Sequence, residues 1–336
     1  MAGHPEHPQR FNLMKAWLEK PPYKGIEWIE SVPAINEDIL RVHSSEMLLS
    51  LRIACSMGLH EIDPAPTFVT GDSFDAAFAA AGGVLTLSRR IQNCSTKKGE
   101  ATRGFAIVRP PGHHADSDES MGFCLFNNTA IAVADALTKG LKKIAIIDFD
   151  AHHGNGTESI FWDEPRVGYF SLHQEHIYPG SGSLDEASHA KGRIINLPLP
   201  LKAGDTVFID VCEKFLDPWL AKFHPEMLFV SAGFDGHFSD PLTSLGFSTQ
   251  GYYQFAKELA ALADKYCDGR LLFIVEGGYA PLALSENIQA VLCALTEGDS
   301  YPNSFGNCSY KTVDIDERIQ KICSLHDLKI PLTFSR

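Results

Sequence analysis

Two aspartates and two histidines follow directly after an apolar run at Ile144–Ile147. The residues from Asp148 to Gly156 read Asp-Phe-Asp-Ala-His-His-Gly-Asn-Gly. A short, wholly apolar, β-branched run is typical of a strand buried on both faces of a parallel sheet. Asp150 and His152 lie two residues apart, so in an extended chain both side chains leave the same face. A carboxylate and an imidazole held in this way predict half of a metal site.

Polar residues also follow three other predicted strands, and Asp235 in the sequence Ala-Gly-Phe-Asp would supply a third ligand. An Asp/His/Asp set with open positions for water and substrate is the arrangement of a catalytic zinc site, although Fe²⁺ or Co²⁺ also accept such ligands. Metal binding lowers the pKa of water to ~7 and makes a nucleophile available. The alternative is that these residues only form caps and turns at strand ends. Four polar groups at four strand ends favour the metal site.

His113 and His114 follow Pro110-Pro111-Gly112, and two adjacent histidines after such a turn suggest proton transfer. Buried imidazoles need partners on their far nitrogens, and Asp148 and Asn155 are the candidates. A carboxylate partner would keep one histidine cationic, whereas an amide partner would leave the other freer to exchange protons.

Tyr279, after Glu276-Gly-Gly, could place a hydroxyl where an oxyanion forms, and such a donor is worth roughly 3–4 kcal/mol of barrier. The alternative is a core tyrosine after a Gly-Gly turn. Phe123 and Tyr178 lie in glycine-bearing loops, and they either belong to the core or form the wall of an apolar tube.

Strands and helices alternate along the chain, which predicts an α/β protein of three layers, with a mainly parallel sheet and helices on both faces. Two prolines between Leu59 and Pro66 predict a loop there. The absence of linkers and repeats indicates one domain over residues 1–336, with a C-terminal tail from about residue 300. The expected strands are Phe105–Val108, Ile144–Ile147, Val167–Leu172, Ile194–Leu197, Met227–Ser231 and Leu271–Val275. The expected helices are Phe11–Leu18, Asn36–Val42, Ser44–Met57, Ser73–Gln92, Phe126–Leu137, Asp205–Leu220, Ser248–Asp264, Ala283–Leu295 and a weaker one from Val313.

Composition limits the possible partners and compartment. The formal charge of −13 argues against direct nucleic-acid binding, and it is explained equally well by a cationic substrate or by solubility alone. No apolar run approaches ~20 residues, so no membrane association is expected. Eight cysteines without a Cys-x-x-Cys pair, and an N-terminus without a secretory signal, indicate a reducing compartment, cytoplasmic or nuclear.

Six motifs in order make the chain resemble the metal-dependent histone deacetylases from about His4 to Leu295, closest to the class II type and its bacterial relatives. Those relatives include acetylpolyamine and acetoin-utilisation amidohydrolases. The motifs are Arg109–His114, Gly122–Cys124, Asp148–Gly156, Tyr178–Gly182, Ala232–Asp235 and Glu276–Tyr279. The resemblance implies the arginase/deacetylase fold and hydrolysis of acyl-amine bonds, here acetylated lysine in proteins or peptides.

The resemblance also implies roles for individual residues. It assigns His114 as general base and acid, His113 as an electrostatic histidine paired with Asp148, and Tyr279 as the residue that polarises the acyl carbonyl. It implies zinc ligands at Asp150, His152 and Asp235, and a substrate tunnel at Gly122, Phe123 and Tyr178. It implies a structural potassium ion at Asp148, Ser171 and the carbonyls of Asp150, His152 and Leu172.

Departures from the family pattern refine this expectation. Asn155 stands where class I members carry Asp, and a tyrosine rather than a histidine at position 279 predicts real activity. Leu242 occupies the position of the glutamate gate of polyamine-selective members, so acyl-lysine is favoured. Asp63 lies near the position of an aspartate that holds the substrate backbone. The strand that usually precedes His4 is absent.

Three other hypotheses remain open. A binuclear ureohydrolase would need carboxylates where Gly154 and His237 stand. Deacetylation of polyamines or other small amines is weakened by Leu242. A catalytically silent subunit of a regulatory complex or oligomer is disfavoured by the intact ligands, histidines and Tyr279.

Overall fold

The centre of the protein is a six-stranded sheet in which every neighbouring pair of strands is parallel. The computed structural model describes residues 3–14, 17, 23–94 and 102–329. The strand order is β3-β8-β7-β4-β5-β6. The strands are β3 (Arg103–Ala106), β4 (Ile144–Asp148), β5 (Val167–Gln174), β6 (Ile194–Leu199), β7 (Met227–Ala232) and β8 (Leu271–Val275). The α/β prediction is confirmed.

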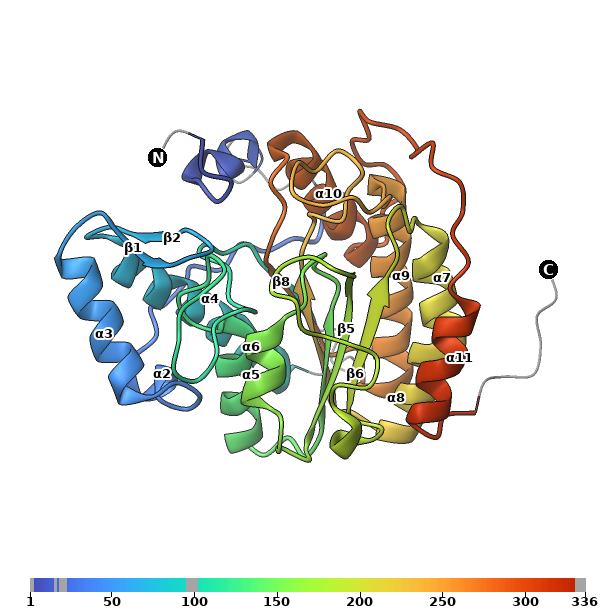
Figure 1. Cartoon of the computed structure of the whole chain (residues 1–336), viewed down its shortest axis with the longest axis horizontal. Coiled ribbons are helices and arrows are strands. Elements are labelled where there is room, and N and C mark those ends of the chain that lie inside the picture. The colour runs from blue at the N-terminus through green and yellow to red at the C-terminus, as the bar shows by residue number, and fades with distance from the viewer. Residues whose placement is uncertain (1–2, 15–16, 18–22, 95–101, 330–336) are drawn as a thin grey trace.

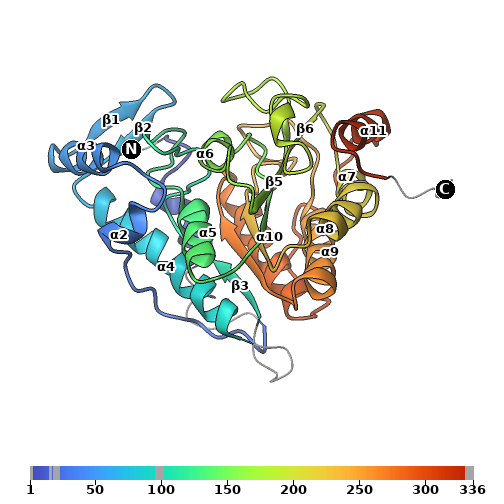
Figure 2. The same ribbon diagram turned by 90° about the horizontal axis from the view of Figure 1, so that it is seen from below.

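Helices cover both faces of this sheet (Figures 1 and 2). One layer contains α4 (Ser73–Asn93) and α5 (Asn128–Thr138), with α2 (Asn36–Ile39) and α3 (Ser45–Ser56) beyond them; the other contains α7 (Thr206–Val211), α8 (Asp217–Phe223), α9 (Thr249–Tyr266), α10 (Pro281–Leu295) and α11 (Asp316–Leu325). Strand β4 shows why two cores form. Ile144 and Ile146 pack into the core under α4 and α5, whereas Ala145 and Ile147 pack into the core under α9 and α10. Alternate residues of β4 thus enter opposite cores, and because both faces of the strand are buried its sequence is apolar without interruption.

Local sequence signals fix several helix boundaries. Side chains of Ser44, Asn127 and Ser248 accept hydrogen bonds from backbone N–H groups in the first turns of α3, α5 and α9. Such caps contribute about 1 kcal/mol each. Gly82 is required within α4, because a Cβ there would lie 2.0 Å from the carbonyl oxygen of Val32.

The prediction of a loop over Leu59–Pro66 is wrong. An antiparallel hairpin forms from β1 (His60–Asp63) and β2 (Thr67–Val69), and both prolines lie in its turn. The strands have only four and three residues and an irregular register, so they carry no readable alternation. The sequence also missed α6 (Asn155–Ile160), which begins inside the polar motif. The helix predicted at Asp205–Leu220 contains the π-helical turn η4 (Cys212–Leu216) between α7 and α8.

The chain ends differ from the prediction in detail. A 3₁₀ helix, η1 (Pro8–Met14), replaces the first part of the helix expected at Phe11–Leu18, and residues 15–16 and 18–22 lie outside the described part. Helix α11 packs into the core through Ile319 and Ile322, so part of the expected tail belongs to the fold. Within the described residues no strand pairs with the outer edge of β3. None of the helices described is long and apolar enough to cross a membrane.

Candidate active site

The polar motifs gather beyond the carboxyl ends of neighbouring strands. Parallel registers align Asp148 at the end of β4 with Ser171 of β5 and Ser231 of β7. The loop after β7 carries Asp235, and the loop after β8 carries Tyr279. Because all these strands run in one direction, their following loops meet at one edge of the sheet, where ligands bind in such folds.

Asp150, His152 and Asp235 form one cluster whose ligand atoms lie within 4.8 Å of one another. His152 Nδ1 lies 2.8 Å from Asp235 Oδ2 and 3.2 Å from Asp150 Oδ1. Backbone N–H groups of Gly277 and Ala151 donate to Asp150 Oδ2 and Asp235 Oδ1, each at 2.8 Å, and thereby orient both carboxylates. Two oriented carboxylates and one imidazole suit a divalent metal, and fixed partners of this kind strengthen such sites.

The carboxylates of Asp150 and Asp235 make this site strongly negative, and the pKa values of its groups shift accordingly. Burial alone would lower the pKa of His152, but the carboxylates of Asp235 and Asp150 raise it to about 10. Burial and the neighbouring Asp150 raise the pKa of Asp235. The same negative field that favours a proton on His152 Nδ1 favours a metal cation at that position. The donor set therefore fits a metal.

Glycines allow this close packing. A Cβ at Gly233 would lie 2.0 Å from Asp150 Oδ2, and one at Gly277 would lie 2.6 Å from the same atom. A Cβ at Gly154 would lie 2.2 Å from Asp148 Oδ2. The space that a second-metal carboxylate at position 154 would need is thus already filled, which argues against the binuclear hypothesis. His237, at its other required position, is buried and bonds through Nδ1 to the hydroxyl of Ser239.

The two histidines have different partners, as their sequence predicted. His113 Nδ1 donates to Asp148 Oδ2 at 3.1 Å, and His114 Nδ1 donates to Asn155 Oδ1 at 2.8 Å. The rings lie 4.0 Å apart, and both side chains are buried. Because the amide oxygen of Asn155 accepts a hydrogen bond from Nδ1–H of His114, the Nε2 of His114 carries the free lone pair when the ring is neutral.

The two histidines also differ in charge. Burial would lower the pKa of His113, but Asp150 and Asp148 raise it to about 10. Burial, together with the neighbouring His113 and His152, lowers the pKa of His114 well below its usual value. At neutral pH one imidazole is therefore cationic and its neighbour is neutral. A cationic group beside a neutral base suits electrostatic stabilisation combined with proton transfer.

Tyr279 is held by residues that the sequence analysis missed. Its backbone N–H donates to Asp240 Oδ2 at 2.7 Å, and the guanidinium of Arg10 lies 4.8 Å from the centre of its ring. Arg10 is fully buried and donates to the carbonyls of Gly278 and Glu276. Burial raises the pKa of the Tyr279 hydroxyl well above its usual value, so it stays a donor.

Glu6 completes this support. Its carboxylate accepts hydrogen bonds from Arg10 and from Nε and Nη2 of Arg109, the latter two at 2.7 Å each. The only available sequence signal was a Glu and an Arg four residues apart in the opening segment, and that spacing does not reveal their partners.

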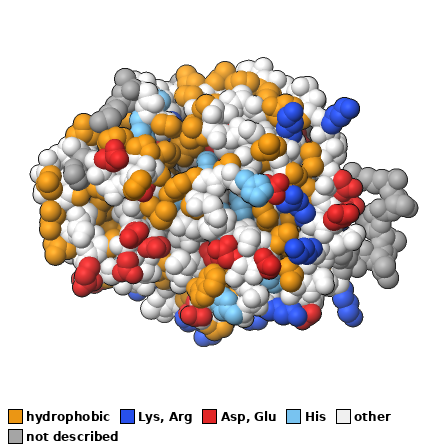
Figure 3. All heavy atoms as spheres, viewed as in Figure 1, with side chains coloured by type: hydrophobic (Ala, Val, Ile, Leu, Met, Phe, Trp, Pro, Cys, Tyr) orange, Lys and Arg blue, Asp and Glu red, His pale blue; other side chains and the backbone are white. Residues whose placement is uncertain are grey.

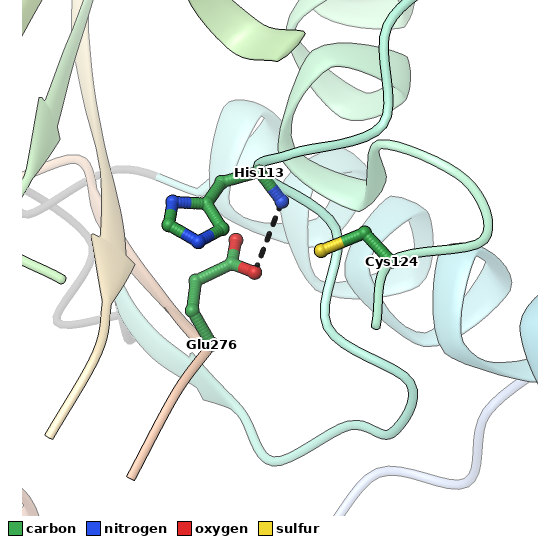
Figure 4. Close-up of side chains that lie close together, drawn as sticks. All are labelled: His113, Cys124 and Glu276. Carbon is green, nitrogen blue, oxygen red and sulfur yellow. Dashed lines mark hydrogen bonds between the residues drawn. The ribbon is translucent and has the colours of Figure 1, made fainter. Parts of the chain in front are cut away.

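Figure 4 shows a second group of metal-ligating residue types, His113, Cys124 and Glu276. It lies beside the first group, since His113 Nε2 is 3.8 Å from Asp150 Oδ1. Glu276 Oε2 accepts from the backbone N–H groups of Gly112 and His113, and Oε1 accepts from Ser231. The sulfur of Cys124 accepts from the backbone N–H of His114. Since these acceptors already have donors, the cluster is a buried hydrogen-bond network that fixes the turn before the histidine pair.

The predicted wall residues lie beside the histidines and Tyr279. Tyr178 lies edge-on to His114 with 5.1 Å between ring centres, and Phe123 lies edge-on to Tyr279 at 5.8 Å. Tyr178 is 36% exposed and Leu242 39%, as expected for side chains at an opening. The carboxylate of Asp240 accepts from the N–H of Leu242 as well as from that of Tyr279, which ties the Leu242 turn to the site.

The residues predicted for a second ion lie on neighbouring strands. Asp148 is aligned with Ser171, and Leu172 follows in β5; all three are fully buried. The hydroxyl of Ser171 bonds with His173 Nδ1 at 2.9 Å. Asp148 Oδ1 accepts from the N–H of Asp150 at 3.2 Å.

Known proteins resemble this chain in sequence and in overall structure. The histone deacetylase domain matches residues 4–295. The chain is 37% identical to "Histone deacetylase 14, chloroplastic" of Arabidopsis thaliana, over 97% of this chain and 82% of that protein. It is 37% identical to a "Probable deacetylase" of Archaeoglobus fulgidus, over 82% of this chain and 77% of that protein. The crystal structure of the HDA15 HD domain superposes with a TM-score of 0.82 at 31% identity, covering 96% of this chain and 90% of that chain.

Proposed function

The chain belongs to the histone deacetylase family, and we propose that it removes acetyl groups from lysine side chains of proteins or peptides by hydrolysis. The family supports deacetylation in general. One observation carries the proposed chemistry: His114 is neutral, has its Nδ1 proton bound by Asn155, and lies 6.1 Å, between ring centres, from His152 of the candidate metal triad. A base with a free lone pair thus lies beside a site that can activate water.

We propose that Asp150, His152 and Asp235 hold one Zn²⁺. Zinc there would supply Lewis acidity, which polarises an acyl carbonyl and lowers the pKa of water. The support is the donor set, its backbone-oriented carboxylates and its negative field. Gly154, which leaves no room for a further carboxylate, supports one catalytic metal rather than two.

The proton steps follow from the histidine pair. His114 Nε2 takes a proton from the attacking water and later gives it to the leaving amine, so that the products are acetate and a free lysine amine. His113, kept cationic by Asp148, stabilises the negative charge of the tetrahedral intermediate electrostatically. The Tyr279 hydroxyl donates to the oxyanion, which is worth about 3 kcal/mol of barrier.

The substrate enters between aromatic side chains. Phe123 and Tyr178 suit the four methylenes of a lysine stem, which need apolar contact and offer no hydrogen bonds. The neutral Leu242 at the opening offers no counter-charge to the distal ammonium of a polyamine, which favours acyl-lysine. We further propose a structural K⁺ beneath the site, at Asp148, Ser171 and the carbonyls of Asp150, His152 and Leu172. Its support is the alignment of Asp148 with Ser171.

The remaining expectations stay predictions. They include a single domain over residues 1–336, the absence of nucleic-acid and membrane partners, and a regulatory complex or oligomer. On the face shown in Figure 3, Lys and Arg lie mainly on the right side, whereas Asp and Glu are spread from the left side across the centre to the right. The predicted cytoplasmic or nuclear location competes with a plastid location, because two relatives carry the word "chloroplastic" in their names.

The test compares two substrates and two variants. Zinc-loaded protein is incubated with an acetyl-lysine peptide and with N8-acetylspermidine, and acetate release is measured. Tyr279→Phe and His114→Ala should each lose activity by a factor of roughly 10² or more. Absence of hydrolysis of both substrates by the unmodified protein would refute the proposal. Faster turnover of the polyamine would make small amines the substrate class.

A further inference from the structure

The turn at Gly122–Phe123 has an unusual backbone. Both residues adopt the left-handed backbone conformation, with φ of +56° for Gly122 and +69° for Phe123. A phenylalanine rarely adopts this conformation, and it persists only where the surroundings hold it. Gly122 cannot be replaced, because a Cβ there would lie 2.5 Å from Cδ2 of His114. The turn therefore lies directly between the catalytic base and the aromatic wall.

The β1–β2 hairpin holds this turn through two side chains. The N–H of Gly122 donates to Asp63 Oδ2, and the N–H of Phe123 donates to Thr67 Oγ1, each at 2.9 Å. The Thr67 hydroxyl in turn donates to Asp63 Oδ2 at 2.9 Å. Thr67 is only 2% exposed, so water cannot readily replace its hydroxyl. One carboxylate–hydroxyl pair thus satisfies both N–H groups of the left-handed turn.

The Phe123 ring also contacts the hairpin side of the site. The ring of His4 lies edge-on to Phe123 at 4.9 Å and to Phe68 of β2 at 5.4 Å. His4 Nε2 donates to the carbonyl of Pro66 in the hairpin turn at 2.8 Å. The hairpin therefore holds the backbone of Phe123 directly, and it supports one side of the ring through His4, while Tyr279 lies against the ring as well.

We propose that Asp63 and Thr67 are positioning residues that fix Phe123 in the tunnel wall and thereby set which substrate stems the tunnel accepts. This inference rests on the proposed function, since it concerns the passage of the acyl-lysine stem. Without the Thr67 hydroxyl, the Phe123 N–H loses its acceptor and Asp63 loses a donor. The left-handed turn then relaxes, and the Phe123 ring takes more than one position. A tunnel with a mobile wall discriminates less between a thin methylene stem and a thicker one.

The test uses a nearly isosteric substitution and two controls. Thr67→Val replaces the hydroxyl by a methyl group, and Thr67→Ser keeps the hydroxyl. Thr70→Val makes the same change just beyond β2, where the hydroxyl bonds with that of Ser73. The kcat/KM is measured for an acetyl-lysine peptide and for the same peptide with a 4-(acetamidomethyl)phenylalanine stem. In Thr67→Val the preference for the lysine stem should fall by about 2- to 10-fold, as expected for one lost hydrogen bond. Thr67→Ser and Thr70→Val should keep it.

A second measurement needs no turnover. With 4-fluorophenylalanine at position 123, the ¹⁹F NMR spectrum should show one sharp resonance for the unmodified protein and both controls. Thr67→Val should add a second resonance or broaden the first. An unchanged resonance together with unchanged stem preference, or with an equal loss on both stems, would overturn the inference. If the unmodified protein hydrolyses neither peptide, the proposed function fails, and the resonance alone decides whether the hairpin positions Phe123.

Discussion

Replacing Asn155 by Asp should move the acid limb of the pH–rate profile to higher pH. The substitution is isosteric and puts a negative charge where a neutral amide oxygen now lies 2.8 Å from His114 Nδ1. The neutral amide leaves burial and the cationic neighbours to lower the pKa of His114. At a separation of about 4 Å and an effective dielectric constant of about 20, a carboxylate favours the imidazolium by roughly 4 kcal/mol. Solvent and neighbouring charges reduce this effect, so we expect an increase of about 1–3 pKa units.

The sign of the change follows from the role of His114 as a base. The neutral form is active, so raising its pKa removes activity at low pH, by a factor of about ten per pH unit below the new pKa. The assay is kcat/KM for an acetyl-lysine peptide from pH 5 to 9. Asn93→Asp, at the exposed end of α4, serves as a charge-matched control and should leave the profile unchanged. An unshifted acid limb in Asn155→Asp, with activity retained, would refute the assignment of His114 as the base.

Three further substitutions test other parts of the structure. Gly233→Ala would place a Cβ 2.0 Å from Asp150 Oδ2, so zinc affinity should fall about 10- to 100-fold in a competition titration with a chelator; unchanged affinity would contradict the cluster geometry. Arg10→Met leaves Glu6 with Arg109 as its arginine partner and removes the Arg10 donor from the carbonyls of Gly278 and Glu276. The free energy of unfolding in urea should therefore fall by about 3–5 kcal/mol, and a fall of less than about 1 kcal/mol would contradict this role of Arg10. Burial lowers the pKa of His43 to about 4 in the folded protein, whereas its unfolded value is about 6.5. Between these two pH values the unfolded chain binds one proton more than the folded chain, so the free energy of unfolding falls as the pH falls. His43→Gln should flatten that dependence by up to about 3 kcal/mol relative to the exposed control His189→Gln, and equal pH dependence in both variants would contradict the assignment.

The strand-end motifs were predictable because their signals are local. The apolar run predicts the buried strand, which ends at Asp148, and Asp150 and His152 follow within four residues of that end. The partners of the histidines could also be predicted, because Asp148 and Asn155 belong to the same short segment as the metal ligands. Chemistry carried by consecutive residues is readable wherever the backbone geometry is regular.

The supporting contacts could not be predicted because they join distant segments. Arg10 reaches the carbonyls of Gly278 and Glu276, more than 260 positions away, and no pattern near Arg10 indicates this. The same holds for Thr67 and Phe123, which meet across 56 positions. The hairpin itself was missed because two prolines in its turn resemble a loop and its strands are too short to show a period. Contacts between distant segments, rather than local sequence preference, determine the hairpin and the positions of these supporting side chains.

The central claim is that water attacks the acyl carbon at the Asp150–His152–Asp235 site. The most direct measurement is mass spectrometry of the acetate that zinc-loaded protein releases from an acetyl-lysine peptide in H₂¹⁸O. We expect one ¹⁸O atom per acetate formed in a single turnover, and no labelled acetate above background from Asp235→Asn. Acetate without ¹⁸O, or equal labelled release by Asp235→Asn, would contradict it.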